Sequence, residues 1–266
     1  MDPLIVTATP NICWLEPTVP YPSSPSELAA EAKLCEDAGA SILHMHSEGQ
    51  WTEAIDLLRA QTSLIVQCGM SSLPIPERME VFEARADMIS IITSHHDEAF
   101  AGMDCHALHP REELLEYCRL SHKYGVRLEL EIWHTGSIWN LKYMIANGAL
   151  TPPYITTLFF DWPGGSWSPA TVEEYEYRRR HLPDGSVATV SIMGSNQLGL
   201  LTAAILRGDH VRVGTEDQPR NRGGEVVATH ELVAEISHLS RMLGREVATP
   251  DRAREIMGIG SVSVIS

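Results

Sequence analysis

The feature that most limits the possible folds is an eightfold alternation of a short apolar segment with a longer helical segment. Apolar, β-branched runs predict strands at residues 4–9, 41–46, 63–69, 87–93, 126–133, 155–162, 187–193 and 210–215. Runs that are apolar throughout are typical of strands buried on both faces of a parallel sheet. Eight such units in 266 residues predict a closed (β/α)8 TIM barrel, because an open doubly wound sheet of this length usually has fewer strands.

The helical segments carry their own start and stop signals. Helical spacing of apolar residues predicts helices at residues 24–38, 51–60, 75–85, 111–124, 137–147, 171–181, 196–207 and 229–243, with a short extra helix at 250–257. Ser24 or Ser26 can cap the first helix and Gly39 stops it, while Thr249 or Asp251 can cap the last. No low-complexity linker interrupts the rhythm, so we expect one catalytic α/β barrel domain over residues 1–266.

The composition excludes several classes of partner. Lys and Arg number 20 against 35 Asp and Glu, so the net charge of −15 opposes binding of DNA or an anionic membrane through the general surface. The five cysteines include no C-x-x-C pair, which argues against a zinc finger or a disulfide framework. No basic leader precedes an apolar segment, and no apolar run is long enough to span a membrane. We expect a cytoplasmic protein that binds neither nucleic acid nor membrane.

The second predicted strand ends in His44-Met45-His46. Residues two apart on a strand point to the same side, so both imidazoles can reach the mouth of the barrel, where active sites of this fold collect. Two imidazoles at this spacing suit a divalent transition metal. The alternative is a pair of buried histidines that hydrogen-bond to backbone carbonyls.

The eighth predicted strand ends in Arg212-Val-Gly-Thr-Glu216-Asp217. In a closed barrel the eighth strand adjoins the first, so a carboxylate here can join His44 and His46. Two histidines and one carboxylate with open positions are typical of a catalytic metal site. The alternative is a solvated turn in which Arg212 pairs with Glu216.

Two carboxylates, Glu129 and Glu131, lie two residues apart inside the fifth predicted strand. Buried carboxylates are costly unless a cation is near, so they indicate a metal or Arg212 beside them, or a salt bridge within the core. Ser94 and His95 end the fourth strand, and Ser71 and Ser72 end the third. These polar loops can contact a substrate, or they are ordinary tight turns.

Taken together, these motifs resemble the β-keto acid cleavage enzymes, also called the 3-keto-5-aminohexanoate cleavage family. The likeness is carried by His44-Met-His46, Glu129-Leu-Glu131 and the R-x-G-x-E-D motif at 212–217, and residues 4–8, 36–44 and 244–257 extend it over nearly the whole chain. Within the likeness, the loops at residues 9–14, 68–72 and 94–96 depart from the family pattern.

The resemblance implies a zinc-dependent TIM barrel that condenses a β-keto acid with acetyl-CoA, giving acetoacetate and a new acyl-CoA. It implies one Zn²⁺ per chain and a homo-oligomer, a dimer or a tetramer. The residues assigned on this basis are the metal ligands His44, His46 and Glu216, the catalytic pair Arg212 and Asp217, and the substrate-binding residues Asn11, Ser71, Ser72, Ser94, His95 and Glu129. The divergent loops imply a keto acid different from that of other members.

Two other functions fit parts of the pattern. A metal-dependent hydrolase on a TIM barrel also uses an H-x-H motif, but on its first strand and with further histidines on the fifth and sixth; here the sixth predicted strand has none. A metal-binding barrel without turnover is the other alternative, suggested by the altered loops.

Overall fold

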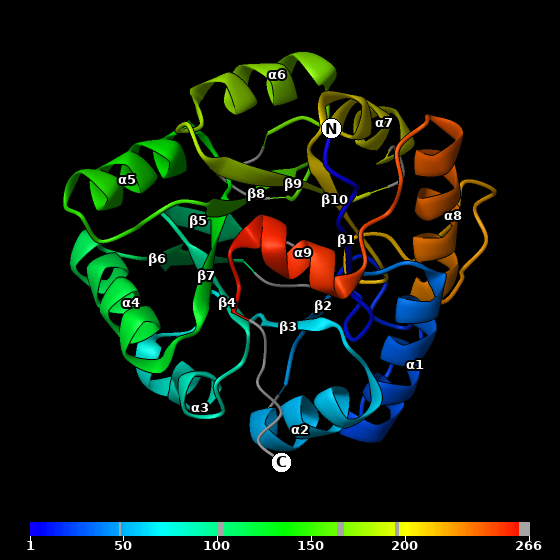
Figure 1. Cartoon of the computed structure of the whole chain (residues 1–266), viewed down its shortest axis with the longest axis horizontal. Helices are drawn as coiled ribbons and strands as arrows, with labels where there is room; N and C mark the ends of the chain where they lie inside the picture. Colours follow the sequence, from blue (N-terminus) through cyan, green and yellow to red (C-terminus); the bar gives the residue numbers. More distant parts are fainter. Residues whose placement is uncertain (48, 100–103, 164–167, 195–196, 261–266) are drawn as a thin grey trace.

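The computed structural model describes residues 1–47, 49–99, 104–163, 168–194 and 197–260. Eight parallel strands close into a barrel, as the alternation predicts, and the helices surround it (Figure 1). The barrel strands, in order around the barrel, are β1 (Val6–Ala8), β2 (Ile42–Met45), β3 (Ile65–Cys68), β4 (Met88–Ile92), β7 (Arg127–Ile132), β8 (Tyr154–Phe160), β9 (Ser186–Ile192) and β10 (His210–Val213). Pairing of β1 with both β2 and β10 closes the ring, which confirms the TIM-barrel prediction.

The helices follow the predicted segments to within a few residues. They are α1 (Pro25–Ala38), α2 (Trp51–Gln61), α3 (Met79–Glu83), α4 (Arg111–Tyr124), α5 (Thr135–Ala146), α6 (Val172–His181), α7 (Gln197–Arg207), α8 (Thr229–Met242) and α9 (Pro250–Met257). The segment predicted as one helix at 75–85 begins instead as a 3-10 helix, η1 (Ile75–Arg78). Ser24 caps α1 in a capping box with Glu27, and Thr249 caps α9.

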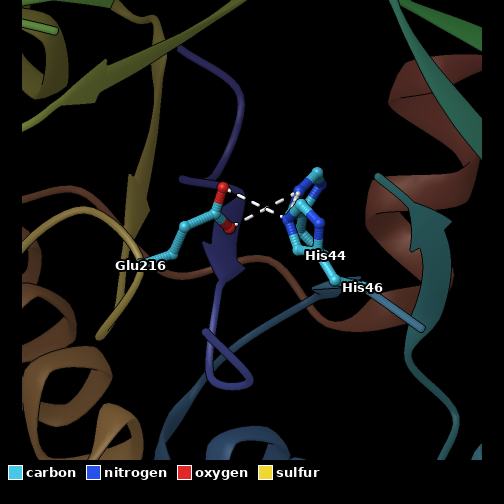
Figure 2. A group of neighbouring side chains, drawn as sticks. All are labelled: His44, His46 and Glu216. Atoms are coloured by element: carbon cyan, nitrogen blue, oxygen red, sulfur yellow. Dashed lines mark hydrogen bonds and ion pairs between the residues drawn. The ribbon is translucent and has the colours of Figure 1, made fainter. Parts of the chain in front are cut away.

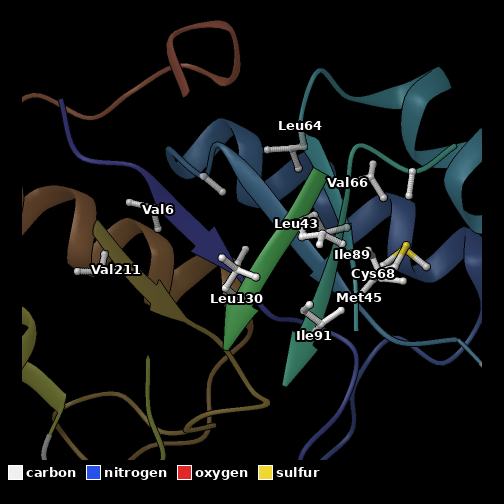
Figure 3. Packing of buried hydrophobic residues seen from close by; sticks show 14 of the residues in the cluster. Val6, Leu43, Met45, Leu64, Val66, Cys68, Ile89, Ile91, Leu130 and Val211 are labelled. Carbon is white, nitrogen blue, oxygen red and sulfur yellow. The ribbon is translucent and has the colours of Figure 1, made fainter. Parts of the chain in front are cut away.

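The main core lies between the barrel and its ring of helices. Strand residues that point outward pack against the helices, and Figure 3 shows Leu43, Met45, Val66, Ile89 and Ile91 among them. Because side chains alternate along a strand, the residues between these point into the barrel. The inward-pointing positions therefore decide what the barrel interior can do.

The floor of the barrel is apolar and closed by the last helix. Ile5, Ile42, Ile65 and Met88 point inward at the beginning of their strands and form a cluster with Met257 of α9. In Figure 1, α9 lies across the centre of the ring of strands. Solvent and substrate therefore reach the interior from the opposite end, where the strands terminate.

A two-stranded antiparallel hairpin, β5 (His95–Glu98) with β6 (Cys105–Leu108), follows β4 at that open end. The sequence does not predict this hairpin, because β5 consists of polar residues and carries no hydrophobic pattern. None of the helices in the described part of the chain is long and apolar enough to cross a membrane.

Candidate metal centre and active site

Three side chains converge at the open end of the barrel in the way the sequence predicts. Nε2 of His44 and Nε2 of His46 lie 3.2 Å apart, and the carboxylate oxygens of Glu216 lie 3.5 Å and 3.3 Å from them. Figure 2 shows the two rings facing this carboxylate across a shared space. The three ligand atoms lie within 4.8 Å of one another, which suits a single metal ion.

The protonation of the His44 imidazole fits a metal. Nδ1 of His44 lies 3.1 Å from Oε1 of Gln67, an acceptor, so Nδ1 carries the proton and Nε2 presents its lone pair. Burial lowers the pKa of His44 to about 3, which keeps the ring neutral. Oε2 of Glu216 is buried with no hydrogen-bond partner among the described residues. The lone pair on Nε2 of His44, the imidazole of His46 and an unsatisfied carboxylate oxygen are a donor set suited to a divalent cation.

Gly69 and Met70 shape the wall beside the two rings. A Cβ on Gly69 would lie 2.8 Å from Nε2 of His44 and 2.8 Å from Cε1 of His46, so only glycine fits there. Met70 adopts a positive φ of 60° and brings its sulfur 3.1 Å from Nδ1 of His46. The fully buried Arg78 holds this turn by donating to the carbonyl of Gly69 at 3.0 Å.

The loop after β10 owes its course to Gly214. A Cβ on this residue would lie 2.5 Å from the carbonyl oxygen of Thr9, which directly follows the adjacent strand β1, so the R-x-G-x-E-D motif requires glycine here. Oγ1 of Thr215 then donates to the carbonyl of Pro10 at 2.9 Å. These contacts turn Glu216 and Asp217 back into the barrel.

Arg212 joins the two carboxylates. Its Nη2 lies 2.7 Å from Oε1 of Glu216 and 2.8 Å from Oδ1 of Asp217, and its Nε donates to Oδ2 of Asp217 at 3.0 Å. Burial would raise the pKa of Glu216, but Arg212 together with the histidines holds it well below its usual range. Burial outweighs Arg212 at Asp217 and raises its pKa to about 6.

A cavity of about 200 Å³ opens beside these groups. The ligands His44, His46 and Glu216 line it together with Arg212. Its other walls are aromatic (Trp14, Trp133, Phe159, Trp162) and acidic (Glu98, Glu131). Trp133 stacks on Phe159 with ring centroids 4.4 Å apart, and the guanidinium of Arg212 lies 5.3 Å from the Phe159 ring centre. The cavity therefore combines a candidate metal site, one cation and a rigid aromatic wall.

Two of the six predicted substrate-binding residues, Ser71 and Ser72, line this cavity. Glu129 is predicted to line the cavity, but Glu131 lines it instead. Both side chains point into the barrel, and Glu129 lies one layer of side chains nearer the barrel floor. Burial and then Glu131 raise the pKa of Glu129 to about 8. The period of two identified the correct face of the strand but not the correct depth.

The other three predicted substrate-binding residues do not line this cavity. His95 is exposed, since alternation along β5 points His96 and Glu98 inward instead. Ser94 is buried and contacts Nε2 of His134 at 3.2 Å. Asn11 binds the backbone of His46 through both ends of its amide, so it supports a ligand. Asp217 is fully buried behind Arg212 and does not line the cavity either.

Comparison with known proteins agrees with the resemblance seen in the sequence. A 3-keto-5-aminohexanoate cleavage enzyme of Acetoanaerobium sticklandii is 30% identical over 97% of this chain and 99% of its own length. A 3-dehydrocarnitine:acetyl-CoA trimethylamine transferase of Rhizobium meliloti is 23% identical over 88% of each chain. The apo structure of ObcA superposes with a TM-score of 0.73 at 14% identity; the match covers 90% of this chain and 65% of ObcA, and shows the shared barrel fold.

The family profile described as beta-keto acid cleavage enzyme matches residues 3–259, nearly the whole chain. This match includes every residue of the candidate metal centre and of the R-x-G-x-E-D motif. The protein belongs to the β-keto acid cleavage enzymes.

Proposed function

We propose that this enzyme is zinc-dependent and condenses a β-keto acid with acetyl-CoA, giving acetoacetate and a new acyl-CoA. The observation that carries the proposal is the convergence of His44, His46 and Glu216 beside Arg212 in one cavity. The name of the Rhizobium meliloti relative, which includes acetyl-CoA, supports the second substrate. Two nitrogen ligands and one oxygen ligand suit zinc, one ion per chain. When bound, zinc supplies a Lewis acid that polarises a ketone and stabilises developing negative charge on its oxygen.

The chain's own groups bind and orient the keto acid. Ser71 lines the cavity, where its hydroxyl group can hydrogen-bond to the carboxylate of the substrate, while Ser72 donates its hydroxyl proton to Glu98. Arg212 supplies a fixed positive charge beside the same space, and such a preorganised charge stabilises an oxyanion better than water does. Asp217 acts through Arg212, because its bidentate contact fixes the guanidinium plane and it does not reach the substrate.

The reaction also moves protons. Acetoacetate contains a carbon–carbon bond that neither substrate had, so one carbon acid loses a proton when this bond forms, and a carbon gains one when the old bond breaks. Besides the ligand Glu216, the described carboxylates that line the cavity are Glu98 and Glu131. Oε2 of Glu131 accepts a hydrogen bond from the indole of Trp133 at 2.8 Å, which fixes the carboxylate toward the aromatic wall.

The proposal is tested with purified, metal-loaded protein, acetyl-CoA and a panel of β-keto acids that differ in side chain. Mass spectrometry should detect acetoacetate together with the acyl-CoA of the keto acid that turns over. Metal analysis should find about one zinc per chain, and His46→Ala should lose both metal and turnover.

Other outcomes separate the alternatives. Cleavage of a substrate without acetyl-CoA would favour a metal-dependent hydrolase. Bound metal with no product from any keto acid would favour a metal-binding barrel without turnover. Full metal content in His46→Ala would refute the ligand set.

We also propose that the protein is cytoplasmic and forms a dimer or a tetramer. The free thiols of Cys13, Cys35, Cys68 and Cys118 suit a reducing compartment. Trp139 and Leu108 are 55% and 72% exposed, and a subunit contact would cover such side chains. Light scattering coupled to size exclusion gives the subunit number directly.

A further inference from the structure

The hairpin at the mouth of the barrel places two histidines on one buried face. His96 pairs with Ala107 across the two strands, and the backbone N–H of His109 donates to the carbonyl of Ser94. Residues 94, 96 and 98 of one strand therefore share a face with residues 107 and 109 of the other. His96 and His109 are diagonal neighbours on this face, a separation that ring side chains can span.

His96 connects this face to the cavity. It is 1% exposed, and its ring stacks on Trp133 with centroids 4.5 Å apart. Nε2 lies 2.9 Å from Oε1 of Glu98, which also accepts a hydrogen bond from the hydroxyl of Ser72. Nδ1 is buried with no partner among the residues that the structure describes. One nitrogen of the ring thus contacts a residue that lines the cavity, and the other is buried on the side away from that contact.

His109 connects the same face to the surface. Its Nδ1 lies 3.4 Å from Oε1 of Glu113, whose side chain on α4 is 21% exposed. Nε2 of His109 is buried and, within the described ranges, has no partner either. Buried imidazole nitrogens are normally satisfied, so two such atoms from diagonal neighbours indicate one shared bridging group. A water molecule has the size and the hydrogen-bonding capacity for this position.

We infer that Glu98, His96, His109 and Glu113 form a proton relay between the active-site cavity and solvent, with a water molecule bridging the two imidazoles. The inference rests on the proposed function, because it supplies the proton exchange that the carbon–carbon chemistry needs. It assigns a catalytic role to Glu98, which lines the cavity, and a relay role to three residues behind it. The relay transfers protons and binds no other ligand.

The transfers balance at every atom. In the outward direction, the Glu98 carboxyl group gives its proton to Nε2 of His96, and the proton on Nδ1 leaves through water to Nε2 of His109. The proton on Nδ1 of His109 then passes to the carboxylate of Glu113 and to solvent. Each ring gains one proton and loses one, so both stay neutral and end as the opposite tautomer. The reverse transfers return a proton and restore both tautomers, as a reaction that first releases and then recovers a proton requires.

The electrostatic surroundings suit neutral rings. Burial lowers the pKa of His109, Glu113 opposes this shift, and positive charge on His96 lowers the pKa further. Glu131 on β7 also acts on His109 and raises its pKa. Burial lowers the pKa of His134, the N-cap residue of α5, and the positive charges of His95, Arg178 and His96 lower it further. In the described part of the chain, the charged and titratable groups that act on these rings include Glu98, Glu113, Glu131, His134, His95 and Arg178.

The test compares His109→Gln and Glu113→Gln with His106→Gln. Gln retains hydrogen-bonding groups but cannot relay a proton through a ring, while His106, on the outer face of the same hairpin, has a side chain 81% exposed. The first two variants should lower kcat about 10-fold or more and leave KM unchanged, because neither residue lines the cavity. In these two variants, added imidazole should restore kcat, and the solvent deuterium isotope effect on kcat should be larger than in the wild type. A variant that has merely lost its fold would show neither the rescue by imidazole nor the larger isotope effect.

Unchanged kcat and isotope effect in both variants, matching His106→Gln, would overturn the relay. A second measurement separates this result from a failure of the proposed function. In ¹⁵N-labelled histidine spectra of the wild type, Nδ1 of His96 should shift when His109 is titrated, and this response should vanish in His109→Gln. If no β-keto acid turns over, the proposed function fails, but the spectra still test the relay. Independent titration of the His96 and His109 rings would then overturn the relay as well.

Discussion

Gln67 on β3 accepts a hydrogen bond from Nδ1 of His44 on β2 across 3.1 Å, in the interior of the barrel. The two residues are paired across adjacent strands, so the register of the sheet brings them together. This contact directs the lone pair of Nε2 toward Glu216 and His46. Gln67 thus orients a metal ligand without being a ligand itself.

Removing this support should weaken metal binding. Gln67→Leu leaves Nδ1 of His44 without an acceptor, and loss of such contacts typically costs about 10- to 100-fold in metal affinity. Gln67→Glu keeps an acceptor at the same place and should bind metal at least as tightly as the wild type. Competition with a zinc chelator measures both. Equal affinity of the Leu variant and the wild type would show that the tautomer is fixed in another way.

Gly69 should tolerate no side chain. In Gly69→Ala the new Cβ would press on both imidazoles at 2.8 Å, so we expect metal affinity to fall by at least about 10-fold. Gly199→Ala is the matched control, because nothing lies within 4 Å of a Cβ there, and alanine in helix α7 should stabilise the fold by about 1 kcal/mol. Metal content after dialysis and the unfolding midpoint distinguish the two. Full metal content in Gly69→Ala would mean that the rings can move aside.

Asp217 should matter for turnover and not for metal. Asp217→Asn replaces one acceptor oxygen with a donor that faces the guanidinium of Arg212, so the cation is misaligned while His44, His46 and Glu216 remain. We expect kcat to fall about 100-fold, comparable to the loss of one preorganised donor, with metal content unchanged.

Asp209→Asn provides the control for Asp217→Asn. Asp209 forms a similar bidentate pair with Arg179, at 2.5 Å and 3.0 Å, but neither residue lines the cavity. This variant should lose stability and keep its kcat. An Asp217→Asn enzyme with wild-type kcat would remove Asp217 from the mechanism.

Much of this structure could be predicted from the sequence, and the parts that could not share a cause. Apolar strands and helix caps are local signals, so the eight barrel strands and the order of the helices followed from them. His44, His46 and Glu216 could be grouped because barrel topology alone brings the ends of their strands together. Strand β5 consists of polar residues and directs His96 and Glu98 toward the cavity, so it has no apolar pattern to detect.

Two properties decide which residues face the substrate: the face of the strand that a residue occupies and its distance from the barrel floor. Local sequence patterns determine neither. His95 and His96 are adjacent in the sequence and differ only in which face of β5 they occupy. Glu129 and Glu131 share a face and differ in depth by one layer. The wall formed by Trp133, Phe159 and Trp162 combines the end of β7 with the end of β8, and neither segment alone indicates it.

The buried carboxyl group of Glu129 should make folding stability depend on pH. Burial and then Glu131 raise its pKa in the folded state to about 8, above the 4.5 of an ordinary carboxyl group. Between these two values the folded state holds a proton that the unfolded state has released. The free energy of unfolding should therefore fall as pH rises through this window, by up to about 1.4 kcal/mol per pH unit, and level off above it.

Glu129→Gln removes this dependence, because glutamine stays neutral at every pH. The stability of the variant relative to the wild type should increase from about pH 5 to about pH 8 and then stay constant. Urea unfolding at several pH values measures it, and the exposed Glu53→Gln on α2 serves as the control with a flat difference. A flat difference for Glu129→Gln as well would mean that Glu129 is ionised in the folded protein, with a cation such as the bound metal or Arg212 compensating its charge.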